Sequence, residues 1–269
     1  MSISNLKNKN YCDIYKEHTG FVSDKWMHYF FIYDLLFYKF IAENKPVTLL
    51  EIGVQNGGSL EIWGKYLPDN SKIYGVDITP DCCKLKFGKN IRFHLGSASD
   101  PKFMNDVFKD INFDIILDDG SHICNDVVKT FKNMFPKLKN GGVYVVEDLH
   151  TSYWGYYGGG LFKKSSSVEF FKNLIDSLNS DYFKHGKRDM VRNFFYKKHI
   201  KFLEEYNRHI QSIQFFDSVC AIYKYNNLKT VPFQTVKTGE IENVAKMPNS
   251  KKHIKSQEKE LNAVKNLFL

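Results

Sequence analysis

The sequence lacks the features expected of a membrane protein or of one from an oxidising compartment. Its most apolar early run, YFFIYDLLFYKFIA, is interrupted by Asp34 and Lys39 and is too short to cross a bilayer. The N-terminus has no apolar core like that of a signal peptide. The five cysteines include no C-x-x-C pair, and their odd number is typical of reduced thiols. We therefore expect a soluble, cytoplasmic protein without a membrane partner.

Signatures of nucleic-acid binding are also missing. The 269 residues carry a formal net charge of +8 and have a pI near 9.0, but no RNP-like or zinc-finger pattern accompanies the basic residues. A basic balance alone indicates an anionic partner or nothing specific. We therefore expect a small-molecule partner and no nucleic acid.

Apolar runs alternate with helical patterns over the first half of the chain. The expected strands are VTLLEI, KIYGVDI, IRFHLG, FDIILDD and GGVYVVED, and the expected helices cover residues 29–42, 59–66, 101–110 and 124–138. Because each strand is almost continuously apolar, the pattern predicts an α/β fold whose parallel sheet is covered on both faces. Further on, HIQSIQFFDSVCAIYKY predicts two strands that turn at Asp217-Ser218 and add an antiparallel edge.

The chain divides into three expected parts. Residues 1–45 form an N-terminal helical segment, residues 46–228 form the main domain, and residues 229–269 form a basic tail. The run TSYWGYYGGGLFKKSSS is too long for a simple connection, so it marks a lid insertion at about residues 150–200. Homo-oligomerisation remains an open alternative.

A glycine turn follows the first strand. The run EIGVQNGGS lacks the G-x-G-x-x-G of dinucleotide enzymes, and its spacing resembles the E-x-G-x-x-x-G motif of class I S-adenosylmethionine-dependent methyltransferases. Such a turn is often only tight packing, but Asp77, 24 residues beyond Gly53, favours a cofactor site. The resemblance implies that Asp77 accepts the ribose hydroxyls. The implied cofactor-binding residues are Glu51, Gly53, Asn56, Gly57, Ser59, Asp77, Ser97 and Asp118.

Two pairs of acids end the fourth and fifth expected strands. They occur in DDGSH, residues 118–122, and in EDLH, residues 147–150. The ends of neighbouring parallel strands meet at one edge, where crowded carboxylates repel and raise one another's pKa. A hard divalent cation such as Mg²⁺ would relieve the conflict. The alternative is a set of solvated acids that cap the following helices.

These motifs together resemble the metal-dependent sugar O-methyltransferases of the macrolide and tetracenomycin type. The similarity covers about residues 11–225 and includes DDGSH, GGVYVVEDLHTSYW and the early SDKWMHYF. It implies that the N-terminal segment contributes to the pocket for the cofactor and the substrate. It implies a Rossmann-like class I methyltransferase fold, with a mostly parallel seven-stranded sheet, an antiparallel C-terminal hairpin and helices on both faces. It also implies S-adenosylmethionine as methyl donor, Asp119, Glu147 and Asp148 as metal ligands, and His122 as general base. Carboxylates favour Mg²⁺, while the nearby histidine allows Mn²⁺ or Fe²⁺.

The acceptor is less defined by the sequence. The resemblance implies a sugar, either nucleotide-activated or part of a glycan or glycoside, as in polysaccharide biosynthesis. Candidate substrate residues are Tyr153 and Trp154 of the expected lid, with Arg188 and Arg192 as a diphosphate clamp. The alternatives are methylation of a catechol or of nitrogen, and a noncatalytic module that binds the cofactor or a sugar.

Overall fold

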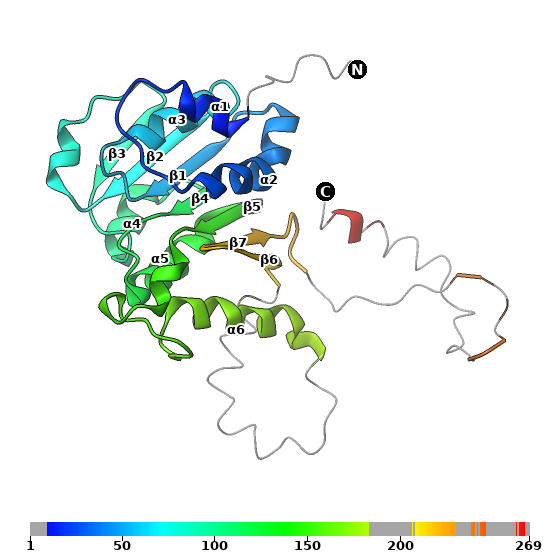
Figure 1. Ribbon diagram of the computed structural model, residues 1–269. Helices are drawn as coiled ribbons and strands as arrows, with labels where there is room; N and C mark the ends of the chain where they lie inside the picture. Colours follow the sequence, from blue (N-terminus) through cyan, green and yellow to red (C-terminus); the bar gives the residue numbers. More distant parts are fainter. Residues whose placement is uncertain are drawn as a thin grey trace.

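A seven-stranded sheet forms the centre of the protein in the computed structural model (Figure 1). The structure describes residues 10–182, 206, 208–229, 238–239, 241, 243–245, 262 and 264–266. The strands are β1 (Thr48–Ile52), β2 (Lys72–Asp77), β3 (Ile91–Leu95), β4 (Phe113–Asp118), β5 (Leu138–Val146), β6 (Ile210–Phe216) and β7 (Val219–Lys224). Their order is β3-β2-β1-β4-β5-β7-β6, and only the β5–β7 and β6–β7 pairs are antiparallel. The predicted fold class is therefore confirmed.

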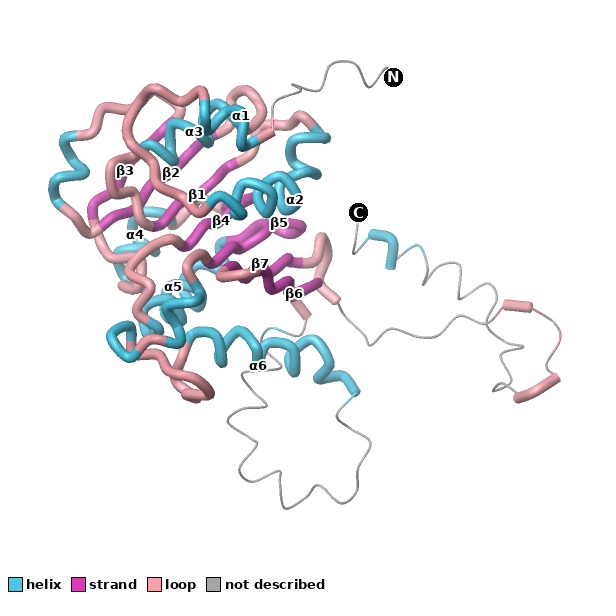
Figure 2. The backbone as a smooth tube through the Cα atoms, viewed as in Figure 1, coloured by secondary structure: helices cyan, strands magenta, loops and turns pink. Residues whose placement is uncertain are grey.

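Helices cover both faces of this sheet (Figure 2). One face carries α1 (Tyr11–Lys16), α2 (Met27–Glu43) and α3 (Gly58–Tyr66), and the other carries α4 (Pro101–Phe108), α5 (Cys124–Met134) and α6 (Ser167–Asn179). Successive strand residues alternate between the two cores, so Leu49 packs with the first group and Leu50 with the second. Two-sided burial explains why the strands are apolar throughout.

The helix expected at residues 124–138 ends earlier than the sequence predicted. Helix α5 stops at Met134, the 3₁₀ turn η3 (Phe135–Lys137) follows, and β5 already begins at Leu138. Pro136 accounts for the difference, because proline has no backbone N–H to continue the helical ladder. The structure thus corrects this boundary and lengthens the fifth strand.

The carboxyl ends of three neighbouring strands lie side by side. Ile52 of β1 is in register with Asp118 of β4, and Asp118 is in register with Val146 of β5. The loops that follow these strands therefore meet at one edge, which is where ligands bind in open α/β sheets. The glycine turn, DDGSH and EDLH are these three loops.

The expected lid begins as a chain of short turns. The 3₁₀ segments η4 (Leu149–Tyr153) and η5 (Gly155–Tyr157) precede α6, and η6 (Ser180–Tyr182) follows it. Another 3₁₀ segment, η2 (Pro80–Lys84), lies earlier in the chain, between β2 and β3. Helix α6 buries Phe171 and Leu174 in the core that it shares with α5. The domain and lid boundaries stay predictions, and residues 183–205 lie outside the described residues. No helix in the described part of the chain combines the length and apolar character needed to cross a membrane.

Candidate active site

A cavity of about 680 Å³ opens at the carboxyl ends of the strands. That volume is within the range of small-molecule and cofactor sites. Its walls come from six parts of the chain: residues 22–26 with 29, residues 52–59 without 56 and 57, residues 76–79, residues 96–99, residues 118–122 with 126, 127 and 130, and residues 147–148. The cavity therefore joins the glycine turn, Asp77 and both acidic loops in one space.

The glycine turn brings its backbone close to the acidic loop. Gly53 has a φ of 91°, and a Cβ atom there would collide with the carbonyl oxygen of Asp119. Gly57 has a φ of 85° and precedes α3 as its N-cap residue, and its N–H donates to the Val54 carbonyl oxygen at 2.8 Å. Only glycine adopts these conformations without strain. The sequence pattern thus has a local reason: a side chain at Gly53 would collide with the Asp119 backbone, and one at Gly57 would meet the Phe87 ring.

Asp77 braces this turn from the end of β2. One carboxylate oxygen accepts hydrogen bonds from the backbone N–H groups of Val54 (2.8 Å) and Gln55 (3.0 Å), and the other accepts one from Thr79 (2.8 Å). Burial alone would raise the pKa of Asp77, but these N–H donors outweigh it and lower the pKa. Asp77 also lines the cavity.

The first acid of DDGSH points away from the others. The Asp118 carboxylate lies on the α4–α6 side of the sheet, is 3% exposed, and accepts a hydrogen bond from the Tyr144 hydroxyl at 3.0 Å. Burial raises the pKa of Asp118 to about 7, against the opposing effect of the hydrogen bond from Tyr144. Asp118 lines the cavity, but its carboxylate does not belong to the cluster that Asp119 forms.

We expect Asp118→Asn to stabilise the fold above pH 7. A carboxyl group whose pKa is raised on folding binds its proton more tightly in the folded state, so stability falls as pH rises from about 4 to about 7. The amide has no such titration, and the variant should unfold with a free energy about 1–3 kcal/mol higher than the wild type at pH 8. Urea unfolding at pH 4.5 and pH 8 measures this difference. The exposed Asp110→Asn is the control, and an equal effect of Asp118→Asn at both pH values would contradict the assignment.

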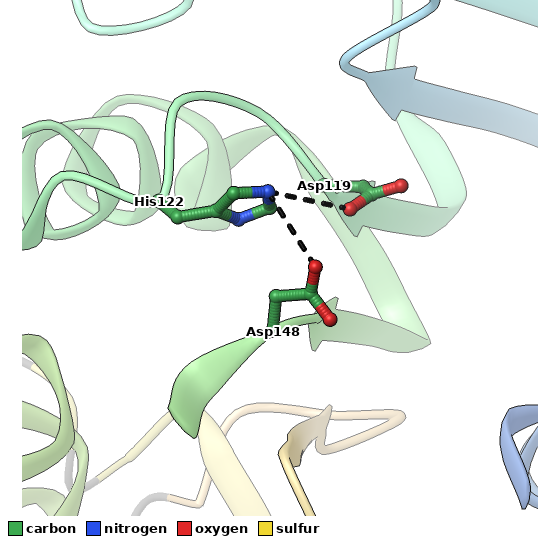
Figure 3. A group of neighbouring side chains, drawn as sticks. All are labelled: Asp119, His122 and Asp148. Atoms are coloured by element: carbon green, nitrogen blue, oxygen red, sulfur yellow. Dashed lines mark ion pairs between the residues drawn. The ribbon is translucent and has the colours of Figure 1, made fainter. Parts of the chain in front are cut away.

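Three side chains converge at the rim of the cavity (Figure 3). The Nε2 atom of His122 lies 3.8 Å from an oxygen of Asp119 and 3.7 Å from an oxygen of Asp148. Each of the three residues offers one potential ligand atom, and these three atoms all lie within 4.8 Å of one another. His122 and Asp148 both have positive φ values, 57° and 51°. Such conformations are uncommon for residues other than glycine and cluster at functional sites.

The N-terminal segment supplies the wall opposite these side chains. Asp148 Oδ1 accepts hydrogen bonds from the Tyr29 hydroxyl at 2.7 Å and from Trp26 Nε1 at 3.1 Å. Lys25 Nζ bonds to Asp119 and, at 2.7 Å, to Glu147, and it lies 3.7 Å from Glu51. The run SDKWMHYF resembles the family's N-terminal segment, but the sequence indicates no role for Lys25 itself. Its only signal was a lysine within a motif shared with the resembled family.

Glu147 is buried on the α2 side of the sheet. It is 1% exposed, and the Tyr33 hydroxyl donates to one oxygen while Lys25 donates to the other. Burial raises the pKa of Glu147, although the charge of Lys25 acts in the opposite direction. Burial also disfavours the charge of Lys25, but the neighbouring charges of Asp119 and Glu147 outweigh it and raise its pKa well above the usual value.

Comparisons with known proteins match this architecture. Residues 50–149 match a family model described as a methyltransferase domain. The 8-demethyl-8-alpha-L-rhamnosyl tetracenomycin-C 2'-O-methyltransferase of Streptomyces olivaceus is 39% identical over 170 residues, which cover 58% of this chain and 43% of that protein. The L-olivosyl-oleandolide 3-O-methyltransferase of Streptomyces antibioticus is 37% identical over 172 residues, with the same coverage of the two chains.

A solved structure shows the same similarity in three dimensions. The MycE methyltransferase from the mycinamycin biosynthetic pathway, in complex with Mg, SAH and mycinamycin VI, superposes with a TM-score of 0.66 at 26% identity. The match covers 81% of this chain and 54% of that one. The chain resembles the sugar O-methyltransferases. It spans less than half of the length of the curated relatives that it matches.

Only some of the remaining residues that the sequence predicted for this methyltransferase-like site line the cavity. Gly53, Ser59 and Ser97 line it, whereas Glu51, Asn56 and Gly57 do not. Tyr153 and Trp154 of the expected lid are about half exposed and lie outside the cavity wall, although the ring of Tyr157 approaches that of His122 at 6.3 Å. Arg188 and Arg192 lie outside the described residues. The roles of all these residues remain predictions.

Proposed function

We propose that the protein is an S-adenosylmethionine-dependent O-methyltransferase that acts on a sugar hydroxyl with the help of a divalent cation. The observation that carries the proposal is the His122–Asp119–Asp148 cluster at the rim of a cavity that continues to the glycine turn and Asp77. The cation, the base and the sugar acceptor are parts of this proposal, as are a role in polysaccharide biosynthesis and a cytoplasmic location.

The residues present fit the proposed methyl donor. The Gly53 backbone passes close to Asp119, and Asp77 lines the cavity beside it; this is the part of the cavity where we place the amino-acid and ribose ends of the cofactor. MycE, which is similar in fold, is named in complex with SAH, the product form of this cofactor. Ser97 lines the cavity beyond Asp77, in the position where we place the adenine end.

The rim also fits a divalent cation. Asp119 and Asp148 each present a carboxylate oxygen toward His122, and such hard oxygen donors suit Mg²⁺ or Mn²⁺. MycE is also named in complex with Mg. A cation held there would supply Lewis acidity toward an acceptor hydroxyl.

The protein side chains then divide the remaining work. Asp77 and the glycine turn would hold the donor, and Trp26 and Tyr29 would hold the Asp148 carboxylate in place through their hydrogen bonds. His122 takes the proton from the acceptor hydroxyl at its Nε2 atom, since that nitrogen faces the rim. With donor and acceptor bound, the methyl group would pass from the sulfonium sulfur to the hydroxyl oxygen, the C–S bond breaking as the C–O bond forms, and S-adenosylhomocysteine would leave.

The acceptor is tested by product formation. The protein is incubated with S-adenosylmethionine, Mg²⁺ and a panel of glycosides, nucleotide sugars, free sugars and a catechol, and mass spectrometry follows the methylated product. We expect methylation of a sugar hydroxyl. Methylation of the catechol alone would replace the sugar proposal, and the absence of S-adenosylhomocysteine with every acceptor would favour a noncatalytic binding module. Preference for nucleotide sugars over glycosides would support the diphosphate clamp.

We expect Asp77→Ala to weaken S-adenosylhomocysteine binding. The change removes a charged acceptor for the ribose hydroxyls and the brace of the glycine turn. A hydrogen bond to a charged group contributes about 1.5–3 kcal/mol, so Kd should rise about 10- to 100-fold. Calorimetric titration measures the affinity, with the exposed Asp81→Ala as control. An unchanged Kd in Asp77→Ala would remove Asp77 from the cofactor site.

A further inference from the structure

Five large apolar side chains are exposed on the loop that leads from η4 into α6. Tyr153 and Trp154 are about half exposed, while Tyr156, Leu161 and Phe162 are exposed by 91%, 70% and 76%. All five lie within residues 153–162, and this loop runs along the edge of the fold beside the start of α6 (Figure 1). Side chains exposed to this extent contribute little to the core, and a cluster of them on the surface marks an interaction site.

A closely bonded backbone holds these side chains outward. The N–H groups of Gly159 and Gly160 donate to the carbonyl oxygens of Trp154 at 3.0 Å and Ser152 at 2.9 Å. A Cβ atom at Gly159 would collide with the Ser152 carbonyl oxygen, and Phe162 has a φ of 57°. A positive φ is costly for a bulky residue and is found where the strain serves a function. The backbone thus presents Phe162 to the solvent at a cost in strain.

Basic residues follow the apolar tip of the loop directly. Lys163 and Lys164 are both exposed, and neither has a carboxylate partner among the residues that the structure describes. Residues 149–168 contain no Asp or Glu, and the next acid, Glu169, is already paired with Lys172 at 2.5 Å. The whole chain has a formal net charge of +8. The loop is therefore cationic as well as apolar, and it attracts an anionic surface.

We propose that the loop of residues 153–164 binds the surface of an anionic lipid bilayer. Leu161 and Phe162 enter the headgroup region, and the two lysines that follow them contact the lipid phosphates. Tyrosine and tryptophan prefer the membrane interface, because one part of each side chain is apolar and the other is polar. Buried apolar area and attraction to anionic lipids together determine the strength of such binding. Contact of this kind needs no spanning helix, so the shortness of the apolar runs does not argue against it.

The docking surface adjoins the candidate active site. The ring centroid of Tyr156 lies 5.2 Å from that of Tyr157, and the centroid of Tyr157 lies 6.3 Å from that of His122. The rim of the cavity is therefore next to the docked loop, and an acceptor held at the bilayer surface would reach the rim without leaving the bilayer. The docking itself does not depend on the proposed reaction.

Vesicle binding tests this surface without any need for turnover. The full chain is mixed with vesicles of phosphatidylcholine alone or of phosphatidylcholine with phosphatidylglycerol, and flotation measures the bound fraction. We expect binding to the anionic vesicles and release at high salt, because salt screens exposed charges. Leu161→Ser/Phe162→Ser should weaken binding at least about tenfold through loss of the buried apolar groups. Lys163→Gln/Lys164→Gln should weaken it about 10- to 30-fold, since each lysine near an anionic surface contributes about fivefold.

Matched controls change the same residue types elsewhere on the surface. Phe31→Ser/Leu35→Ser removes two exposed apolar side chains from α2, and Lys86→Gln/Lys89→Gln lowers the net charge as much as the loop variant does. Both controls should bind anionic vesicles nearly as tightly as the wild type. Loop variants that bind as tightly as their controls would overturn the proposal, and so would a wild-type protein that binds neither kind of vesicle. Either result leaves the proposed methylation intact.

Two further measurements cover the alternatives. Sedimentation velocity shows whether the loop is an interface between two copies of the chain. A wild-type dimer that Leu161→Ser/Phe162→Ser converts to a monomer, with no vesicle binding by either, overturns the bilayer proposal. Hydrogen exchange on the unmodified protein decides the point if the variants do not fold. We expect anionic vesicles to slow exchange within residues 153–164, and unchanged exchange there would contradict the docking.

Discussion

Replacing His122 by alanine should slow turnover by about 10²–10⁴-fold while the cofactor and the metal still bind. That factor is the usual contribution of a positioned general base, and the imidazole Nε2 atom faces the two rim carboxylates, where the acceptor hydroxyl would lie. Single-turnover rates with saturating donor and acceptor measure the chemical step, and Mn²⁺ titration measures the metal.

The control is His150→Ala, which removes a second imidazole near the rim that bonds to Ser218. Near wild-type turnover in His122→Ala would remove the base from the account. Loss of Mn²⁺ together with turnover would instead make His122 a ligand, which its distance from Asp119 and Asp148 also permits geometrically.

Substitution of Asp119 or Asp148 by asparagine should lower metal affinity and turnover together. Each change replaces one of the two carboxylates that point toward His122 by a neutral amide, and hard divalent ions bind amides less well. We expect at least about a tenfold increase in the Mn²⁺ Kd, with turnover partly restored at high metal concentration.

Turnover titrated with Mn²⁺ checks this expectation, with the exposed Asp176→Asn on α6 as control. A variant that loses turnover at every metal concentration but binds Mn²⁺ normally would show that the carboxylate acts on the substrate and not through the ion.

The sheet could be predicted from sequence because its strands are apolar on both faces. Continuous apolar runs such as FDIILD place β4 directly, and each acidic pair follows at the end of a strand. The meeting of those ends at one edge follows from parallel pairing, and the register of Asp118 with Val146 bears this out. The end of α5 was misplaced because the effect of Pro136 was not applied to the helical pattern.

The detailed arrangement of the acids was harder to predict. Alternation along the strands turns Asp118 to the α4–α6 side and Glu147 to the α2 side, so adjacent acids diverge. That period was readable from Val145 and Val146, which pack in opposite cores. The partner of Glu147 was not readable, because Lys25 comes from a distant segment whose path depends on the contact of Val22 with α3 and of Trp26 with Asp148.

The most direct test of the metal-assisted sugar methylation is turnover in the chelated enzyme. The protein is treated with chelator, freed of it, and assayed for S-adenosylhomocysteine formation with the best sugar acceptor before and after single metals are restored. We predict that the chelated enzyme keeps its cofactor affinity, loses turnover, and recovers it with Mg²⁺ or Mn²⁺. Full turnover by the chelated enzyme without any added metal would contradict the account.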